Sequence, residues 1–292
     1  TALRANFYYL GKNIPGYDEV FVQALFALVT GENLFWVSRP GRAKTLAVNS
    51  MFGMFPNTRV FYIQFTKDTM PDNLFGNPIP DELMKTGREI VNLEGGLAMC
   101  EFAHLGEFMD GTDFTVRASL DVLNEHQWSN KDMGTIASPL HMAVATTNFM
   151  RLRDATEAVL DRFLCKAYLQ GIESLTDCMR AGQTYLKDHG EPFKLPYEID
   201  FAELKALSER ILAPEGSNGI TISPGMRLLH VLLVKEFQIR RQASAIAAWK
   251  LKNPNAAEEP PADEVIVPEV TPRTLVKLHD FSRAAAALND RD

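Results

Sequence analysis

NLFWVSRPGRAKTLAVNSMFGMFPNTRVFYIQF, residues 33–65, is the stretch of sequence that decides the fold. Residues 33–37 (NLFWV) form a short apolar run, which predicts a buried strand. A turn follows over residues 38–45, and residues 46–55 have the pattern of a helix. Residues 59–65 (RVFYIQF) are rich in β-branched and aromatic side chains, which predicts a second strand. Strand, loop, helix and strand in this order form a βαβ unit, so we predict an α/β fold with a parallel sheet.

Further strands and helices are predicted on both sides of this unit. Apolar residues at helical spacing predict a helix over residues 17–30, which Gly31 would end. On the C-terminal side we predict a strand over residues 96–105, a helix over 114–126, a hairpin within 127–139, a strand over 140–147 and a helix over 155–169. The alternation of strands and helices extends the parallel sheet.

The composition of the chain changes near residue 188. Residues 188–196 are rich in Gly, Pro and charge, and the pattern beyond them predicts helices over residues 200–212, 223–252 and 271–288. The chain of 292 residues is longer than a single core usually needs. We therefore predict a core over residues 1–187 and a smaller all-helical domain over residues 188–292.

Composition and charge give no support to several classes of protein. The net charge is −7 and the basic residues are scattered, so nothing indicates a surface that binds nucleic acid. No apolar run approaches the ~20 residues of a membrane helix. The N-terminal residues lack the layout of a secretion signal, and three cysteines without metal-site spacing are typical of reduced thiols. We expect a cytoplasmic protein.

The turn over residues 38–45 (SRPGRAKT) has part of a phosphate-binding pattern, G-x-x-x-x-G-K-[S/T]. Lys44 and Thr45 stand where the pattern needs them, at the start of a helix, while Ser38 and Ala43 replace its two outer glycines. Amides at a helix N-terminus and a lysine hold phosphates, and the hydroxyl reaches magnesium. The alternative is an ordinary turn between a strand and a helix, with a solvated lysine.

Several further motifs occur in an order and spacing that resemble the AAA+ core of the MoxR family, especially its RavA-like branch. That branch has a GPPGxAK[S/T] loop, so Ala43 is normal there and Ser38 and Arg39 are the departures. The matching stretches are residues 65–76 (FTKDTMPDNLFG), 93–97 (LEGGL), 123–127 (LNEHQ) and 160–163 (LDRF). Residues 222–224 (ISP) and 270–272 (VTP) resemble helix starts in the family's lid.

This resemblance implies an α/β fold with an AAA+ αβα parallel-sheet core that binds nucleotide, and a smaller all-helical lid domain. It implies ATP or ADP and Mg²⁺ as ligands, a homo-oligomeric ring, commonly a hexamer, and a chaperone-like ATPase that remodels a protein client. A protein with a von Willebrand factor A domain is the expected partner. The alternatives are a pseudo-ATPase that serves as a scaffold, and an unrelated α/β protein that acts on a nucleoside phosphate.

The resemblance also assigns roles to individual residues. It places Glu107, Asn148 and Arg162 on the catalytic positions, with Glu107 polarising water, Asn148 sensing the γ-phosphate and Arg162 acting on a neighbouring subunit's nucleotide. Thr45 is the expected ligand of the metal. The residues expected to bind the nucleotide are Ile14, Gly16, Pro40, Gly41, Arg42, Ala43, Lys44, Thr45, Leu46 and Arg227. Asn148 is alternatively a residue that turns the chain after a strand, and Arg162 alternatively forms a surface salt bridge with Asp161 or Asp154.

One position departs from the family's pattern in a way that bears on hydrolysis. The stretch FAHLGE, residues 102–107, matches the Walker B strand, and Gly106 stands where the family has the aspartate that holds the magnesium shell. Phosphoryl transfer depends on neutralisation of charge, so we expect weakened hydrolysis. His104 points either into packing or toward phosphate. Arg39 and Arg42 would either attract phosphates or fill the pocket and exclude nucleotide.

Substrate contact in the family is expected at two hairpins. They correspond to residues 93–96 and 127–138 of this chain, and we expect both to be exposed.

Overall fold

A computed structural model describes residues 2–149, 159–160, 162–169, 172, 174–189, 191, 193–214, 220–253 and 272–289. The chain forms two compact units, Thr1–Glu209 and Arg210–Asp292. We predicted that the lid domain begins at residue 188, and this functional boundary stays a prediction. Within the described residues, no helix is long and apolar enough to cross a bilayer.

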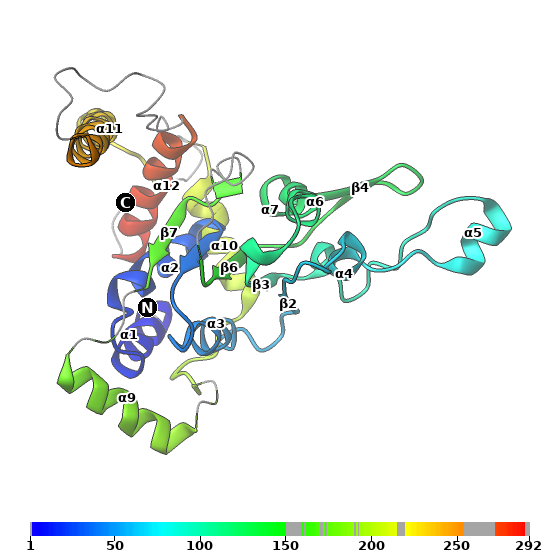
Figure 1. The fold of residues 1–292 in the computed structure, drawn as a ribbon, viewed down its shortest axis with the longest axis horizontal. Coiled ribbons are helices and arrows are strands. Elements are labelled where there is room, and N and C mark those ends of the chain that lie inside the picture. The colour runs from blue at the N-terminus through cyan, green and yellow to red at the C-terminus, as the bar shows by residue number, and fades with distance from the viewer. Residues whose placement is uncertain are drawn as a thin grey trace. The chain divides into compact units, whose positions relative to one another are not determined.

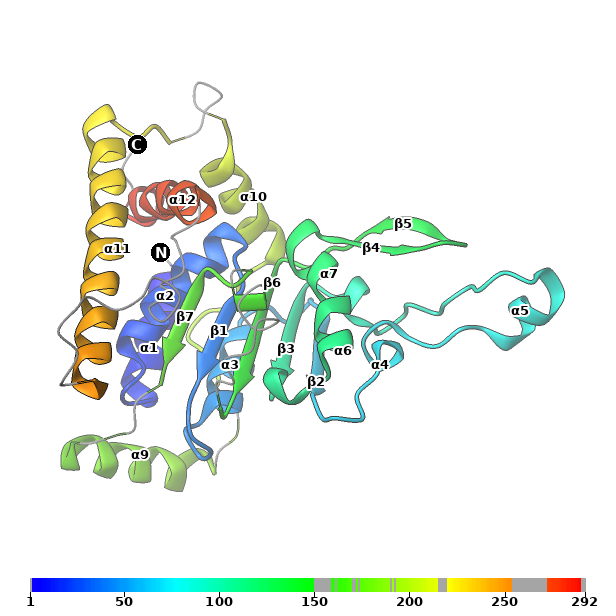
Figure 2. The same ribbon diagram turned by 45° about the horizontal axis from the view of Figure 1, so that its top comes forward.

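A five-stranded parallel sheet forms the centre of the first unit, as predicted. Its strands, in spatial order, are β2 (Val60–Gln64), β3 (Phe102–Gly106), β6 (Met142–Thr147), β1 (Leu34–Val37) and β7 (Cys165–Tyr168). Every residue of β1 is buried, because this strand lies between β6 and β7 and helices cover both faces of the sheet (Figure 2). The predicted α/β fold class, with its helical second part, is confirmed.

The edge strand β7 corrects the sequence analysis. We predicted a helix over residues 155–169, but residues 165–168 pair in parallel with β1, with Cys165 beside Leu34 and Tyr168 beside Val37. The segment is short, and Lys166 and Ala167 favour helices, so its strand conformation depends on the partner strand. Residues 155–158 lie outside the described part of the chain. The predicted third strand also begins later than expected, at Phe102.

Helices surround the sheet and the loops at its ends. Those of the first unit are α1 (Ala2–Asn13), α2 (Asp18–Thr30), α3 (Lys44–Phe52), α4 (Pro71–Phe75), α5 (Pro80–Thr86), η1 (Leu97–Met99), η2 (Phe108–Asp110), α6 (Asp113–Ala118), α7 (Leu120–Glu125) and α9 (Leu175–Asp188). The antiparallel hairpin of β4 (Gln127–Asn130) and β5 (Gly134–Ala137) confirms the one predicted there. Sequence analysis did not predict α1, α5 or α9.

Two apolar layers hold the helices to the sheet. On one face, residues of β1, β3 and β6 pack with α6, α7 and Phe163 in a continuous core. On the other face, Phe102 of β3 stacks on Phe52 and Phe55, and Phe201 of α10 (Phe201–Leu212) packs against it edge-on. The sheet therefore has a fixed face toward α3, and that face carries the side chains at positions 102, 104 and 106.

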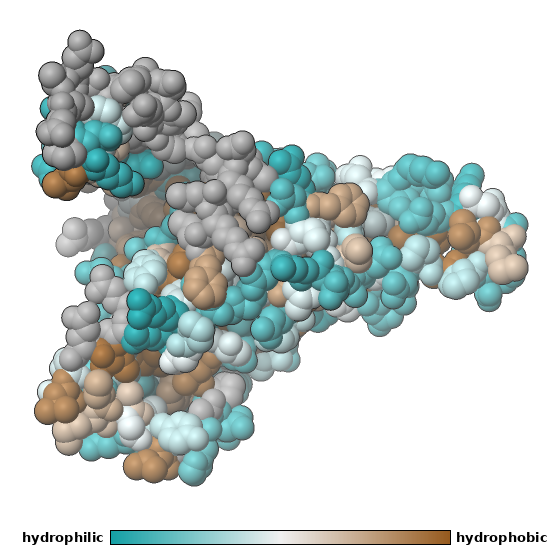
Figure 3. Space-filling view, in the orientation of Figure 1, coloured by the Kyte–Doolittle hydropathy of each residue, from teal (hydrophilic) through white to brown (hydrophobic). Residues whose placement is uncertain are grey.

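An arm projects from the first unit, with α5 at its tip (Figure 1). Its two chains pair at Pro78 and Val91, and the second chain returns to the core at Leu93, which is buried. The expectation that residues 93–96 form the exposed contact is therefore wrong at Leu93. The exposed apolar residues of the arm are instead Leu83 and Met84, which are 46% and 86% exposed. Figure 3 shows apolar surface at the tip of the arm.

The second unit is helical, as predicted. Its helices α11 (Pro224–Lys252) and α12 (Pro272–Leu288) contact each other, and Ser223 caps α11 by accepting a hydrogen bond from the Met226 amide. Between the two helices, His230 meets His279, with 3.3 Å between their Nδ1 atoms, and the Nε2 atom of His230 lies 2.8 Å from the Ser282 hydroxyl. These contacts bury His230.

We predict that acid destabilises the protein, because the pKa values of His104, His141 and His230 are all lowered by burial. The pKa of His104 is about 4. Since the unfolded chain binds protons first, stability is full above about pH 6.5 and is lost as the pH falls toward the folded pKa. The free energy of unfolding should fall by about 2 kcal/mol for His104 alone between about pH 7.5 and about pH 5.

Urea unfolding at the two pH values measures this loss. His104→Leu should remove much of the dependence, while His189→Leu, at an exposed position, should keep it. Equal stability of the unmodified protein at both pH values would contradict the prediction.

Candidate functional site

The loop between β1 and α3 lies at the carboxyl ends of three neighbouring strands. The Ser38 amide donates to the Thr147 carbonyl, which joins the loop to the end of β6. Gly41 and Ala43 both have positive φ, of 76° and 57°, so the chain curls before α3 begins. Carboxyl ends of parallel strands are where α/β proteins bind ligands, and amides of a first helical turn favour anions.

Lys44, the first residue of α3, extends back to the strand ends. Its ammonium donates to the Ser38 carbonyl at 3.1 Å, the Thr147 carbonyl at 3.3 Å and Oδ1 of Asn148 at 2.7 Å. Burial lowers the pKa of Lys44, and the charge of Glu107 opposes this effect. The lysine is therefore a fixed cation at the site, rather than the solvated side chain of the alternative interpretation.

Asn148 connects this lysine to Glu107. Its side-chain amide donates to Oε1 of Glu107 at 2.6 Å, and its backbone amide donates to Oε2 at 3.0 Å. Glu107 follows β3 directly with a positive φ of 50°, which turns its side chain across the end of β6. Three of the predicted site residues, Lys44, Glu107 and Asn148, thus form one hydrogen-bonded chain.

The position before Glu107 has no side chain. Gly106 ends β3 beside Gln64 of β2, on the sheet face that looks toward α3. A Cβ atom there would lie 3.4 Å from the Ile63 carbonyl oxygen and 3.7 Å from the Cα atom of Gln64, which are ordinary contacts, so the position has room for a Cβ atom. Thr45 is exposed in the first turn of α3 and offers a hydroxyl. Among the described residues, no three His, Cys, Asp or Glu side chains gather as a metal site would require.

His104 lies two residues before Gly106 on the same face. It is 1% exposed, its Nε2 atom is 3.4 Å from the Thr146 hydroxyl, and its ring meets Tyr62 edge-on. Burial, reinforced by the charge of Lys44, lowers the pKa of His104 to about 4. The imidazole is therefore neutral at neutral pH and packs within the sheet layer, which favours the packing interpretation over contact with phosphate.

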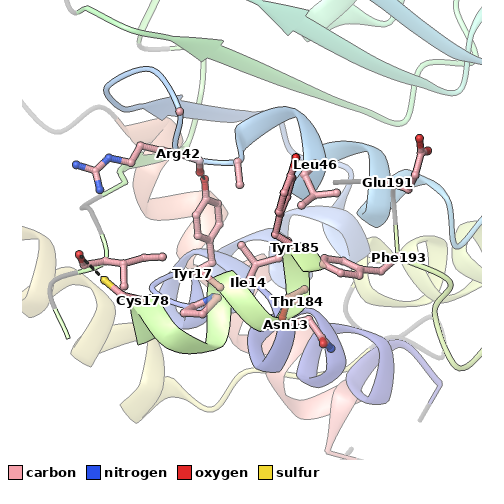
Figure 4. Close-up of a pocket in the computed structure, with 15 residues that line it drawn as sticks. Asn13, Ile14, Tyr17, Arg42, Leu46, Cys178, Thr184, Tyr185, Glu191 and Phe193 are labelled. Atoms are coloured by element: carbon pink, nitrogen blue, oxygen red, sulfur yellow. Dashed lines mark hydrogen bonds between the residues drawn. The ribbon is translucent and has the colours of Figure 1, made fainter. Parts of the chain in front are cut away.

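A cavity of about 420 Å³ lies beside the loop. Ile14, Tyr17 and Leu46 belong to its lining, together with loop residues 41–43. Residues of α9, Tyr185 among them, line its other side, where Tyr185 extends toward Leu46 (Figure 4). A cavity of this size with a mostly apolar lining suits a flat apolar group such as a base, next to a loop that suits phosphate.

Tyr17 fixes the loop to the cavity. Its hydroxyl donates to the Arg42 carbonyl, and its ring packs edge-on against Trp36 of β1. Burial raises the pKa of Tyr17, which keeps the hydroxyl a donor. The Arg42 guanidinium points away from Tyr17 (Figure 4). The contact spans 25 residues of sequence, and no motif predicted it.

The other predicted site residues belong neither to the hydrogen-bonded chain from Lys44 to Glu107 nor to the lining of the cavity. Pro40 is exposed in the loop, and Gly16, with a φ of 82°, is not among the residues that line the cavity. Arg162 lies just before the buried Phe163, while its two suggested partners, Asp154 and Asp161, fall outside the described residues. Arg227 belongs to the second unit, where its Nε atom donates to the Ile222 carbonyl.

Sequence analysis missed part of the cavity. Cys178, Thr184 and Tyr185 of α9 contribute to its lining, as does Phe193, which follows that helix. The Phe193 amide donates to the Ser50 hydroxyl of α3, which holds the segment after α9 against the core. These residues lie more than a hundred positions from the loop, so no local pattern could have assigned them to it.

Comparison with known proteins agrees with this fold. A family model described as the MoxR domain in the MoxR-vWA-beta-propeller ternary systems matches residues 1–209. The fold is similar to that of a candidate ATPase from Cytophaga hutchinsonii, with a TM-score of 0.71 and 21% sequence identity over 99% of this chain and 81% of that chain. At this identity the likeness concerns the fold alone.

The family match over residues 1–209, together with the parallel sheet and the helix that starts at Lys44, identifies an AAA+ ATPase-like module. The chain belongs to the MoxR family, in the group found in MoxR-vWA-beta-propeller systems. The resemblance to the MoxR family stated from the sequence is therefore confirmed.

We predict that Tyr17→Phe loosens the loop without changing the fold. It leaves the Arg42 carbonyl without its donor, so the free energy of unfolding should fall by about 1 kcal/mol. Urea unfolding measures this change. Tyr62→Phe removes a hydroxyl from a residue that is 54% exposed and serves as the matched control, with no loss expected. A loss of the same size in both variants would count against a role for the Tyr17 hydroxyl.

Proposed function

We propose that this module binds ATP and ADP at the loop of residues 38–45 and hydrolyses ATP slowly. The hydrogen-bonded chain from Lys44 through Asn148 to Glu107, beside a cavity of about 420 Å³, is the observation that carries the proposal. Lys44 and the first-turn amides of α3 would hold the phosphates, and the cavity lined by Ile14 and Leu46 would take the base. Glu107 would polarise the attacking water, with Asn148 positioning it.

The weak hydrolysis follows from Gly106. A magnesium ion in such a site would supply charge neutralisation in the transition state, and Thr45 would be its ligand from the protein. Without a carboxylate at position 106, the ion is held less firmly. Arg162 would act in trans on a neighbouring subunit, and Arg227 would contact nucleotide from the lid.

A second candidate function is that of a scaffold that binds nucleotide without turnover. Gly106 favours it, because the position can accommodate a side chain yet carries none. Nucleotide bound between subunits stabilises an assembly by mass action even when it is not hydrolysed. Phosphate release distinguishes the two functions.

We propose further that the chain forms a homo-oligomeric ring, a hexamer, and acts as a chaperone-like factor beside a protein with a von Willebrand factor A domain. The description of the matching family, a MoxR domain in MoxR-vWA-beta-propeller systems, supports this partner. The exposed Leu83 and Met84 on the arm support a contact with a protein client there. The hairpin of β4 and β5 is the second expected contact.

We expect Lys44→Ala to abolish the release of phosphate from ATP. The variant removes the only side-chain cation in hydrogen-bond contact with Asn148 among the described residues. A coupled assay at about millimolar ATP, above typical KM values, measures the rate. Lys85→Ala, on the exposed arm, is the control with an unchanged rate. Equal rates for Lys44→Ala and the unmodified protein would defeat the enzymatic proposal.

Gly106→Asp should raise the rate of phosphate release at least about tenfold, because an added carboxylate anchors the metal that neutralises charge. A Cβ atom at this position would make ordinary van der Waals contacts, the nearest at 3.4 Å, so the variant should fold. Gly106→Asn has nearly the same shape without the charge and should show no gain. Equal rates in the Asp and Asn variants would contradict the argument from metal binding.

A further inference from the structure

The side chains at the ends of β3 and β6 do not fit a firmly held magnesium ion. Proteins hold this ion through one or two carboxylates together with the phosphates of a substrate. Gly106 supplies no carboxylate, and both carboxylate oxygens of Glu107 accept hydrogen bonds from Asn148. Only the hydroxyl of Thr45 remains from the expected ligands. The cation that balances the charge of a polyphosphate must therefore come from elsewhere.

The loop itself carries two further cations. Arg39 follows β1 after one residue and is exposed, and Arg42 is half-buried and lines the cavity. Within the part of the chain that the structure describes, neither guanidinium makes a hydrogen bond or an ion pair. The backbone of Arg42 is fixed by Tyr17, while its guanidinium points away from that ring (Figure 4).

We propose that this site binds nucleoside triphosphate and diphosphate without a divalent cation, and that Arg39 and Arg42 supply the charge. The inference rests on the proposed nucleotide binding at the same loop. Guanidinium groups bind phosphate oxygens in pairs through parallel hydrogen bonds, and they stay charged at every physiological pH. Together with Lys44, the loop carries three positive charges within six residues.

The net charges agree with the replacement of a magnesium ion by two arginines. A magnesium ion with one carboxylate ligand adds one net positive charge, whereas two arginines without that carboxylate add two. The loss of the acidic side chain at position 106 also removes a negative charge that would repel phosphate in the absence of metal. The missing carboxylate at position 106 and the two loop arginines therefore act in the same direction.

The affinity of the full chain for ATP, measured by titration calorimetry in Mg²⁺ and again in excess EDTA, tests the inference. We expect the two dissociation constants to agree within about threefold, a difference below about 1 kcal/mol. Tight binding in Mg²⁺ with at least about tenfold weaker binding in EDTA would overturn the inference and keep the proposed function. No binding in either condition would overturn both, and would indicate that the arginines exclude nucleotide.

Variants assign the effect to the two arginines. Arg39→Gln and Arg42→Gln together should weaken ATP binding in EDTA at least about tenfold, and Mg²⁺ should restore part of the loss. Arg88→Gln makes the same charge change on the exposed arm and should leave both affinities unchanged. Gly106→Asp should make ATP binding depend on Mg²⁺. An arginine double variant that binds like the Arg88 control would overturn the role of the pair.

Discussion

The ammonium group of Lys44 is the point on which the arrangement of the site depends. Oxygens at the ends of β1 and β6, together with the Asn148 side chain, surround it. Because a charged amine in a partly buried site needs such acceptors, the lysine fixes the distance between two strand ends and the first turn of α3. Glu107 then takes its position through Asn148, so one cation orders residues from three separate segments.

The space beside this network has a different chemistry. Tyr17 holds the loop from one side, and α9 with the segment after it encloses the cavity from the other. Apolar side chains dominate this lining, whereas the loop presents amides and cations. A ligand with a flat apolar part and an anionic part matches both regions, and few ligands other than nucleotides combine the two. The membership in the MoxR family agrees with that match.

In the proposed function, Gly106 would weaken turnover without weakening nucleotide binding. The loop, the lysine and the polar residues at the strand ends all remain, so the attraction for phosphate does not depend on the missing carboxylate. Charge neutralisation by a metal in the transition state does depend on it. Loop arginines carry their charge on flexible side chains, which suits ground-state binding better than the fixed geometry that hydrolysis needs.

The sequence by itself determined the class of fold and the identity of the central lysine. The unbroken apolar run of β1 predicts a strand covered on both faces, and the β-branched and aromatic run of β2 predicts a second strand, which the structure places at the edge of the sheet with Val60 and Tyr62 exposed. The order of the MoxR-like motifs identified Glu107 and Asn148 as candidate catalytic residues. Only the tertiary structure decided that residues 165–168 form a strand, that Tyr17 closes on Arg42 and that α9 lines the cavity. Each of these depends on a partner distant in sequence, and local propensity carries no information about such a partner.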